Sequence, residues 1–309
     1  EEVQAILRIC HAHRVPVVAR GAGTGLSGGA LPVAGGLLLV LARLHEILEI
    51  DPQRGLARVQ PGVTNLAVSE AAAPFGLYYA PDPSSQVACS VGGNVAENSG
   101  GVHCLKYGLT VHNVLEVKLV TMTGELLTIG AQTGEAPGLN LLAAVIGSEG
   151  MLGVVVEVTV RLLPLPRRVE LLLAAFADVG QCADAVGQVI AAGIVPAGLE
   201  MMDAPAIRAA EAFARCGYPL DAAALLLCEV DGLPEDVDDE LARARAVLEA
   251  AGATSVRIAR DADERRRMWS GRKSAFPAVG RLAPDYYCMD GTIPRRQLPH
   301  VLQRISEMS

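Results

Sequence analysis

The sequence predicts an α+β protein of two domains. The chain has 309 residues, which is enough for about two domains of ordinary size. Segments with the apolar pattern of strands alternate with segments of helical spacing. The stretch "PLPRR" at residues 164–168 separates a glycine-rich first half from a second half with a more regular alternation. We therefore expect a first domain at residues 1–163 and a second at residues 164–309.

Apolar spacing and turn residues define the elements expected in the first domain. Helices are expected at residues 1–14, 64–76 and 139–146. Strands are expected at residues 15–20, 36–44, 46–51, 56–62, 114–121, 125–130 and 154–163. Thr64 or Asn65 is expected near the N-cap of the second helix. Residues 80–108 fit neither pattern and are expected to be irregular, which in a compact domain indicates function.

The second domain is expected to be a sheet with helices packed on one or both faces. Its predicted strands are residues 169–177, 223–232, 254–260 and 286–294. Its predicted helices are residues 182–193, 204–217, 238–252 and 262–276, with another helix at the end of the chain.

Composition excludes several classes of protein and site. The net charge of −8 argues against a nucleic-acid-binding surface. The seven cysteines form no C-x-x-C pair, so we expect a reducing compartment, no disulfide framework and no zinc or other metal site. There is no apolar run long enough to cross a membrane and no signal peptide. The first residue is Glu1, and we expect the chain to be trimmed at its N-terminus.

The stretch "RGAGTGLSGG" at residues 20–29 is the densest glycine cluster. It contains G-x-G-x-x-G after a predicted strand, as in nicotinamide dinucleotide folds. However, residues 27–36 hold four glycines and Pro32, and the next segment is another strand rather than a helix. A nicotinamide-dependent dehydrogenase therefore stays as an alternative. Close approach of bare backbone to a bulky ligand is the favoured interpretation.

A second cluster, "SVGGNVAENSGG" at residues 90–101, suggests that the two segments form two walls of one site. Exposed backbone N–H groups in such segments bind phosphate oxygens, and Ser27, Ser90, Asn94, Asn98 and Ser99 add side-chain donors. The two segments contain no lysine, and the sequence contains no P-loop pattern. Both observations favour a permanently bound pyrophosphate over a nucleotide that is hydrolysed. Asp82, in "PDPSS", is expected to orient the backbone or to lie at another part of the ligand.

These motifs, together with "YG" at residues 107–108 and "GSEGMLG" at 147–153, resemble the FAD-binding domain of the vanillyl-alcohol oxidase superfamily. In the second half, "LEMMD", "MWSGRKSAFPAVGR" and "DYYCMDGTIPR" resemble the cap domain of the FAD-linked D-2-hydroxy-acid dehydrogenases, most of all the bacterial glycolate oxidase type. The resemblance implies a PCMH-type FAD-binding domain of two subdomains, followed by a ferredoxin-like α+β cap.

The resemblance also implies which residues contact FAD. The residues implied are Arg20, Gly21, Ala22, Gly23, Thr24, Gly25, Ser27, Gly28, Gly29, Pro81, Asp82, Ser84, Gly92, Gly93, Asn94, Asn98, Ser99, Gly100, Gly101, Gly153, Val154 and Val155. Many relatives attach the flavin to a histidine. His103 does not match a linkage position, so we expect non-covalent FAD.

Oxidation of a 2-hydroxy acid needs a cation for the carboxylate, a base for the hydroxyl proton and a hydride acceptor. Arg272 is the expected carboxylate clamp, with Tyr287 and Lys273 as further catalytic candidates and Arg281 as a weaker one. Arg265–Arg267 are expected to be surface residues. Glu200 and Asp203 fit a helix start or a supporting role better than that of the base. Relatives carry a C-terminal "HxGDGNxH"-type motif that is not found here, so we expect the base on a further segment.

The resemblance implies FAD-dependent oxidation of a small D-2-hydroxy acid, glycolate or D-lactate, to the 2-oxo acid. Electrons would leave to an iron–sulfur subunit, a second flavin-type subunit or a quinone chain. The implied location is cytoplasmic, with partner subunits able to hold the protein at the inner membrane. A non-catalytic FAD-binding subunit or truncated paralogue stays open as an alternative.

Overall fold

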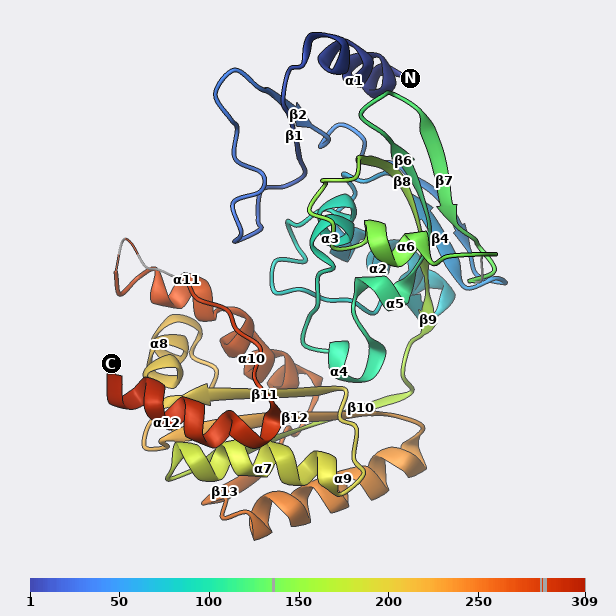
Figure 1. The fold of residues 1–309 in the computed structure, drawn as a ribbon. Helices are drawn as coiled ribbons and strands as arrows, with labels where there is room; N and C mark the ends of the chain where they lie inside the picture. Colours follow the sequence, from blue (N-terminus) through green and yellow to red (C-terminus); the bar gives the residue numbers. More distant parts are fainter. Residues whose placement is uncertain (135–136, 284, 286–287, 309) are drawn as a thin grey trace. The chain divides into compact units, whose positions relative to one another are not determined.

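The computed structural model describes residues 1–134, 137–283, 285 and 288–308. The chain forms two compact units, Glu1–Leu165 and Pro166–Ser309 (Figure 1). Each unit has its own hydrophobic core, as expected for a domain.

An antiparallel five-stranded sheet is the centre of the first unit. In spatial order its strands are β3 (Ile47–Asp51), β4 (Leu56–Val59), β8 (Val154–Arg161), β6 (Val114–Val120) and β7 (Leu126–Gly130). Helices α2 (Asn65–Ala72) and α3 (Val91–Glu97) bury Val68, Val91 and Val95 against Val117 and Val158 of the sheet. The buried residues of α3 are Val91, Asn94 and Val95, and the last two lie three and four positions after Val91, so all three lie on one face of the helix.

A smaller layer flanks this sheet in the first unit. Strands β1 (Val17–Arg20) and β2 (Leu37–Val40) pair in parallel, and helix α1 (Glu2–His13) covers them. Leu7, Leu39 and Leu41 pack against Val120 and Val154 at the ends of β6 and β8. The shorter elements are η1 (Ala73–Phe75), β5 (Leu77–Tyr78), α4 (Cys104–Tyr107), α5 (Thr110–Asn113), α6 (Leu141–Val145) and β9 (Leu163–Pro164).

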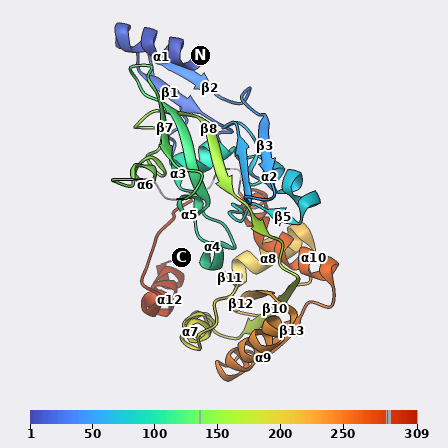
Figure 2. The same ribbon diagram turned by 90° about the vertical axis from the view of Figure 1, so that its right-hand side faces the viewer.

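The second unit is an antiparallel sheet covered on both faces by helices. The strand order is β11 (Gly198–Asp203), β12 (Ala224–Gly232), β10 (Arg168–Phe176) and β13 (Ser255–Ile258). Helices α7 (Val179–Ala191) and α9 (Pro234–Ala250) lie side by side on one face (Figures 1 and 2). Helices α8 (Ala204–Ala214) and α10 (Ala262–Lys273) cover the other.

Alternation along β12 explains why both faces are covered. Leu226 and Cys228 join the core under α7 and α9, whereas Leu225 and Leu227 are equally buried on the opposite face. If the four strands are numbered along the chain, their spatial order is second–third–first–fourth. This is the order of a ferredoxin-like sheet, so the predicted fold class is confirmed. The unit ends with α11 (Ala275–Val279), η2 (Arg295–Gln297) and α12 (Leu298–Met308), which packs along α7.

Three predicted elements differ from the structure. Residues 80–108 are not wholly irregular, because α3 and α4 form within them. Residues 198–203 form strand β11, although Asp203 also starts a helix by capping α8. The strand expected at 286–294 is absent at residues 288–294, which pair with no strand of the described chain. Tyr286 and Tyr287 lie outside the described residues.

None of the helices in the described part of the chain combines the length and the apolar character that crossing a bilayer requires.

Candidate functional site

The segment between β1 and β2 carries the first glycine cluster. Residues 21–36 form no helix or strand, and residues 22–29 are all exposed. Within the described chain, the backbone N–H groups of residues 21–30 donate no hydrogen bond. Gly29 has open space where a β-carbon would lie. Exposed N–H groups on glycine-rich backbone are suited to binding phosphate oxygens, so this segment fits the diphosphate of a dinucleotide. We call residues 21–30 the donor loop.

The donor loop is not a Rossmann fingerprint. In that fold a helix begins at the glycines and crosses over between the two parallel strands. Here β1 pairs directly with β2, and the connection between them contains no helix. The nicotinamide alternative therefore lacks its structural context.

The second glycine segment is mostly helix α3, with Ser90 as its N-cap. The Ser90 hydroxyl accepts a hydrogen bond from the N–H of Gly93 at 3.2 Å, and the N–H of Gly92 bonds Pro61 O at 2.8 Å. A β-carbon on Gly92 would lie 2.5 Å from Cβ of Pro61. These glycines therefore allow close packing within the chain, and their N–H groups already have partners.

Three glycine-containing segments meet around α3. A β-carbon on Gly21 would lie 2.2 Å from Oγ of Ser90, and one on Gly25 would lie 3.7 Å from Oε1 of Glu97. The loop at residues 147–153 reaches the other end of the helix, where the N–H of Gly147 bonds Val95 O at 2.8 Å. The sequence prediction that residues 21–29 and 90–101 lie together is therefore confirmed.

Carboxylates make one end of this arrangement acidic. Burial raises the pKa of Glu97, and the negative charge of Glu149 raises it further. The N–H of Glu149 bonds Ala96 O at 2.8 Å, which fixes the two acids near each other. Because Glu97 lies beside Gly25, the donor loop is electrostatically least suited to phosphate at that glycine.

A buried network of side-chain amides supports α3. Asn65 is 1% exposed, and its Nδ2 donates to Pro81 O at 2.9 Å and to Oδ1 of Asn94 at 3.0 Å. The Asn94 amide in turn donates to Oγ of Ser99 at 3.3 Å. The sequence predicts Asn65 only as a candidate for the helix cap. Its adjacency to an N-cap threonine gave no signal of this role, because Pro81 and Asn94 are distant in sequence.

Asp82 orients the backbone that follows α3. Its carboxylate accepts from the N–H of His103 at 3.1 Å and contacts the His103 ring Nδ1 at 2.9 Å. A β-carbon on Gly101 would lie 2.5 Å from the Asp82 carbonyl carbon. Only glycine therefore fits at this crossing of the two segments.

The remaining predicted cofactor residues have identifiable positions. The Arg20 guanidinium folds over Gly23, so that a β-carbon there would lie 2.5 Å from Nη2. Asn98 ends α3 with φ of 50° and accepts from the N–H of Val111 at 3.0 Å. The other residues lie as follows: Ala22, Thr24, Ser27 and Gly28 in the donor loop, Ser84 in an exposed turn, Gly100 beside Leu109, Gly153 against Val120 O, and Val154 and Val155 buried in β8. Their contacts with FAD stay predictions.

In the second unit, Arg272 forms an ion pair with Glu200. Its Nε and Nη2 atoms lie 2.9 Å and 2.8 Å from the same oxygen, Oε2 of Glu200. The side chains are 29% and 22% exposed, respectively. The predicted carboxylate clamp is thus held by an acid on β11.

Helix α10 is anchored to the sheet by further contacts. The indole N–H of Trp269 donates to Oε2 of Glu229 at 2.5 Å, and the Tyr218 hydroxyl donates to Met268 O. A β-carbon on Gly271 would lie 2.7 Å from the Tyr218 ring, so glycine is needed for this approach. Of the three arginines expected at the surface, Arg266 and Arg267 are exposed, whereas Arg265 is half-buried and its Nη1 donates to Val169 O at 2.6 Å.

The other two catalytic candidates are Lys273 and Tyr287. Lys273 is half-buried at the last position of α10. Tyr287 lies outside the described residues.

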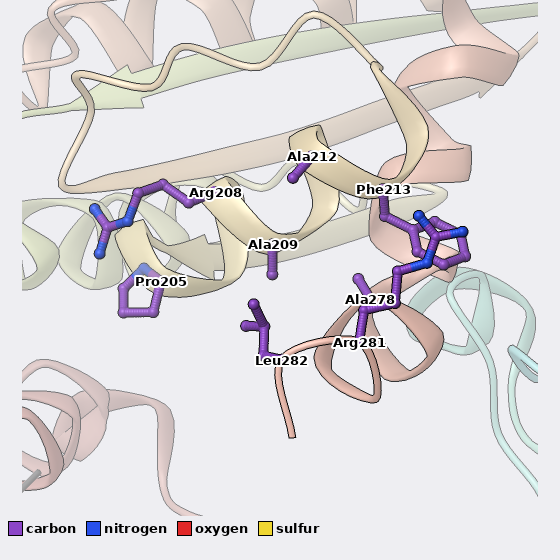
Figure 3. Close-up of a pocket in the computed structure, with 8 residues that line it drawn as sticks. All are labelled: Pro205, Arg208, Ala209, Ala212, Phe213, Ala278, Arg281 and Leu282. Atoms are coloured by element: carbon purple, nitrogen blue, oxygen red, sulfur yellow. The ribbon is translucent and has the colours of Figure 1, made fainter. Parts of the chain in front are cut away.

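A cavity of about 330 Å³ lies between α8 and α11, and Arg272 is not among the residues that line it. Figure 3 shows Ala209, Ala278 and Leu282 facing one another across it, with Arg208 directed away. The Arg281 guanidinium instead lies over the Phe213 ring, 4.3 Å from its centroid. The cations therefore do not converge on the cavity.

The described side chains contain no group of three or more His, Cys, Asp or Glu residues placed to hold a metal ion.

Comparisons with known proteins agree with this geometry. The family described as "FAD binding domain" matches residues 1–130, and "FAD linked oxidases, C-terminal domain" matches residues 165–309. Glycolate oxidase subunit GlcD of Escherichia coli K12 is 63% identical over 309 residues, covering 100% of this chain and 62% of that protein. The D-lactate dehydrogenase of Archaeoglobus fulgidus is 30% identical, covering 100% and 68%.

A solved alkyldihydroxyacetonephosphate synthase has the same fold, with a TM-score of 0.80 at 20% identity, covering 99% of this chain and 63% of that one. The predicted resemblance and the prediction of FAD as cofactor are confirmed. The chain spans less than two thirds of the length of the E. coli subunit. Because the two family models match both halves of the chain and a relative covered to 68% of its length is 30% identical, the chain belongs to the family of FAD-linked oxidases.

Proposed function

We propose that this protein takes part in FAD-dependent oxidation of a small D-2-hydroxy acid, glycolate or D-lactate, to the 2-oxo acid. The observation that carries the proposal is the 63% identity to a glycolate oxidase subunit along the whole chain. The relatives named D-lactate dehydrogenase support the same class of substrate.

The roles of the residues follow from their chemistry. The donor loop would hold the FAD diphosphate non-covalently, with α3 and the 147–153 loop supporting it. When bound, FAD supplies a hydride acceptor. Arg272 would bind the substrate carboxylate through its guanidinium, which is suited to planar, bidentate recognition. Residues 1–163 would thus bind the cofactor and residues 164–309 the substrate.

Partner subunits are part of the proposal. The glycolate oxidase relatives are named as subunits, which supports a multi-subunit assembly. Electrons would pass from FAD to a partner that carries an iron–sulfur centre or a second flavin, or to a quinone chain.

Anaerobic titration of the FAD-loaded protein tests the proposal. We expect glycolate or D-lactate to bleach the flavin absorption band. Reduction by L-lactate alone would contradict it, and binding of FAD with no reduction by any of the three acids would favour a non-catalytic FAD-binding subunit. Acid precipitation should release FAD into the supernatant if attachment is non-covalent.

A further inference from the structure

The ion pair between Glu200 and Arg272 uses only one side of the guanidinium. Both contacts, at 2.9 Å from Nε and 2.8 Å from Nη2, end on Oε2 of Glu200. Within the described chain, no other residue bonds the Arg272 side chain. A guanidinium binds a carboxylate best through two parallel N–H groups. With the Nε edge turned to Glu200, the edge formed by Nη1 and Nη2 is left for an incoming carboxylate.

Helix α10 does not depend on this pair for its position. Trp269 is bonded to Glu229, Tyr218 to the carbonyl of Met268, and Arg265 to the carbonyl of Val169. These contacts fix the part of α10 that precedes Arg272 to strands β10 and β12 and to the loop that contains Tyr218. Glu200 therefore adds little to the placement of the helix and acts mainly on the end of one side chain.

The exposure of the pair supports a role in orientation rather than stability. Both side chains are partly exposed, at 22% and 29%, and ion pairs of this kind contribute little to folding. An unpaired arginine samples many rotamers, and ordering it during binding opposes association. A partner that holds the guanidinium beforehand removes part of that opposition.

We infer that Glu200 is a positioning residue, which orients Arg272 so that its outer edge receives the carboxylate of the substrate. This inference rests on the proposed function, because it takes Arg272 as the carboxylate-binding cation. Through the Glu200 side chain, strand β11 would then influence the affinity for the substrate.

Steady-state kinetics of the FAD-loaded protein with glycolate and D-lactate test the inference. We expect Glu200→Ala to raise KM about tenfold, because a charge-assisted hydrogen bond is lost, with kcat changed less than about twofold. Glu200→Gln retains an oxygen acceptor and should restore KM to near the wild-type value. The FAD content and thermal midpoint of both variants should match the wild type.

Glu170→Ala is the matched control. Glu170 is 24% exposed and pairs with Arg168 at 3.0 Å on the opposite face of the same sheet, so its loss should leave KM unchanged. An unchanged or lower KM in Glu200→Ala would overturn the inference, as would a tenfold rise in Glu200→Gln, which would indicate charge rather than orientation. If no 2-hydroxy acid reduces the wild-type flavin, the proposed function itself fails and this inference with it.

Discussion

Gly21 lies so close to Ser90 that a β-carbon on the glycine would fall 2.2 Å from the serine hydroxyl oxygen. That hydroxyl also caps α3 through the N–H of Gly93. The contact joins the donor loop to the helix that begins the second glycine segment. One contact thus links the position of the loop to the start of α3, although Gly21 and Ser90 lie 69 positions apart in the sequence.

Gly21→Ala should therefore weaken both α3 and FAD binding. The new methyl group displaces the Ser90 hydroxyl and breaks the cap, which costs about 1 kcal/mol. The free energy of unfolding and the Kd for FAD are the quantities to measure. Gly29→Ala is the control, because nothing lies near its β-carbon position. It should leave stability unchanged, and an equal loss of stability in both variants would contradict the explanation.

Asn65→Leu should destabilise the first unit by about 1–3 kcal/mol, because it leaves the buried Asn94 amide and the carbonyl of Pro81 without their donor. Denaturant unfolding measures this cost. Asn140→Ala removes an exposed cap of α6 and should cost no more than about 1 kcal/mol. A larger effect at Asn140 than at Asn65 would show that burial of the network is unimportant.

Arg272→Ala should raise KM for the 2-hydroxy acid strongly, by about a hundredfold, since a charge-assisted carboxylate contact is lost. FAD content should be unchanged, because Arg272 lies in the second unit and the donor loop in the first. Kinetics together with the flavin spectrum check this. Loss of FAD from the variant would mean that the arginine has a structural role.

Trp269→Phe should lower the free energy of unfolding by about 1.5–3 kcal/mol. Phenylalanine keeps most of the apolar contact but removes the N–H that donates to the buried Glu229 carboxylate at 2.5 Å. Urea unfolding measures the change. Phe276→Leu, at an exposed position in α11, should have little effect, and similar losses in the two variants would argue against the hydrogen bond.

Glu211 should make stability depend on acid pH. Burial works against ionisation, but bonds from the N–H groups of Tyr218 and Gly217 and from the Cys216 thiol hold the pKa of Glu211 below its ordinary value. A lowered pKa stabilises the fold above the unfolded-state value of about 4.5, and this contribution is lost as pH falls through the folded-state pKa. Unfolding midpoints measured across this range should fall less steeply with decreasing pH in Glu211→Gln. Parallel curves would contradict the assignment.

Much of the fold could be predicted from local pattern. Residues 2–13 form α1 because their apolar spacing is helical. Residues 114–120 form β6 because Leu115, Val117 and Leu119 alternate with Glu116 and Lys118 and a turn follows. Helix α3 was missed because its two adjacent glycines are typical of loops. The cap at Ser90 and the four-residue spacing of Val91 and Val95 were the available signal.

Residue type and spacing alone predict the strands and helices of two domains, the glycine clusters at residues 20–29 and 90–101, and the basic helix around Trp269. Those properties are local, since they depend on residue type and spacing along the chain. The bond from Asn65 to Asn94, the contact of Gly21 with Ser90 and the pairing of Glu200 with one edge of Arg272 exist only in the folded chain. Each of these contacts joins residues distant in sequence, and hydrogen bonds or close packing of that kind form only when separate elements are brought together by burial of a common core.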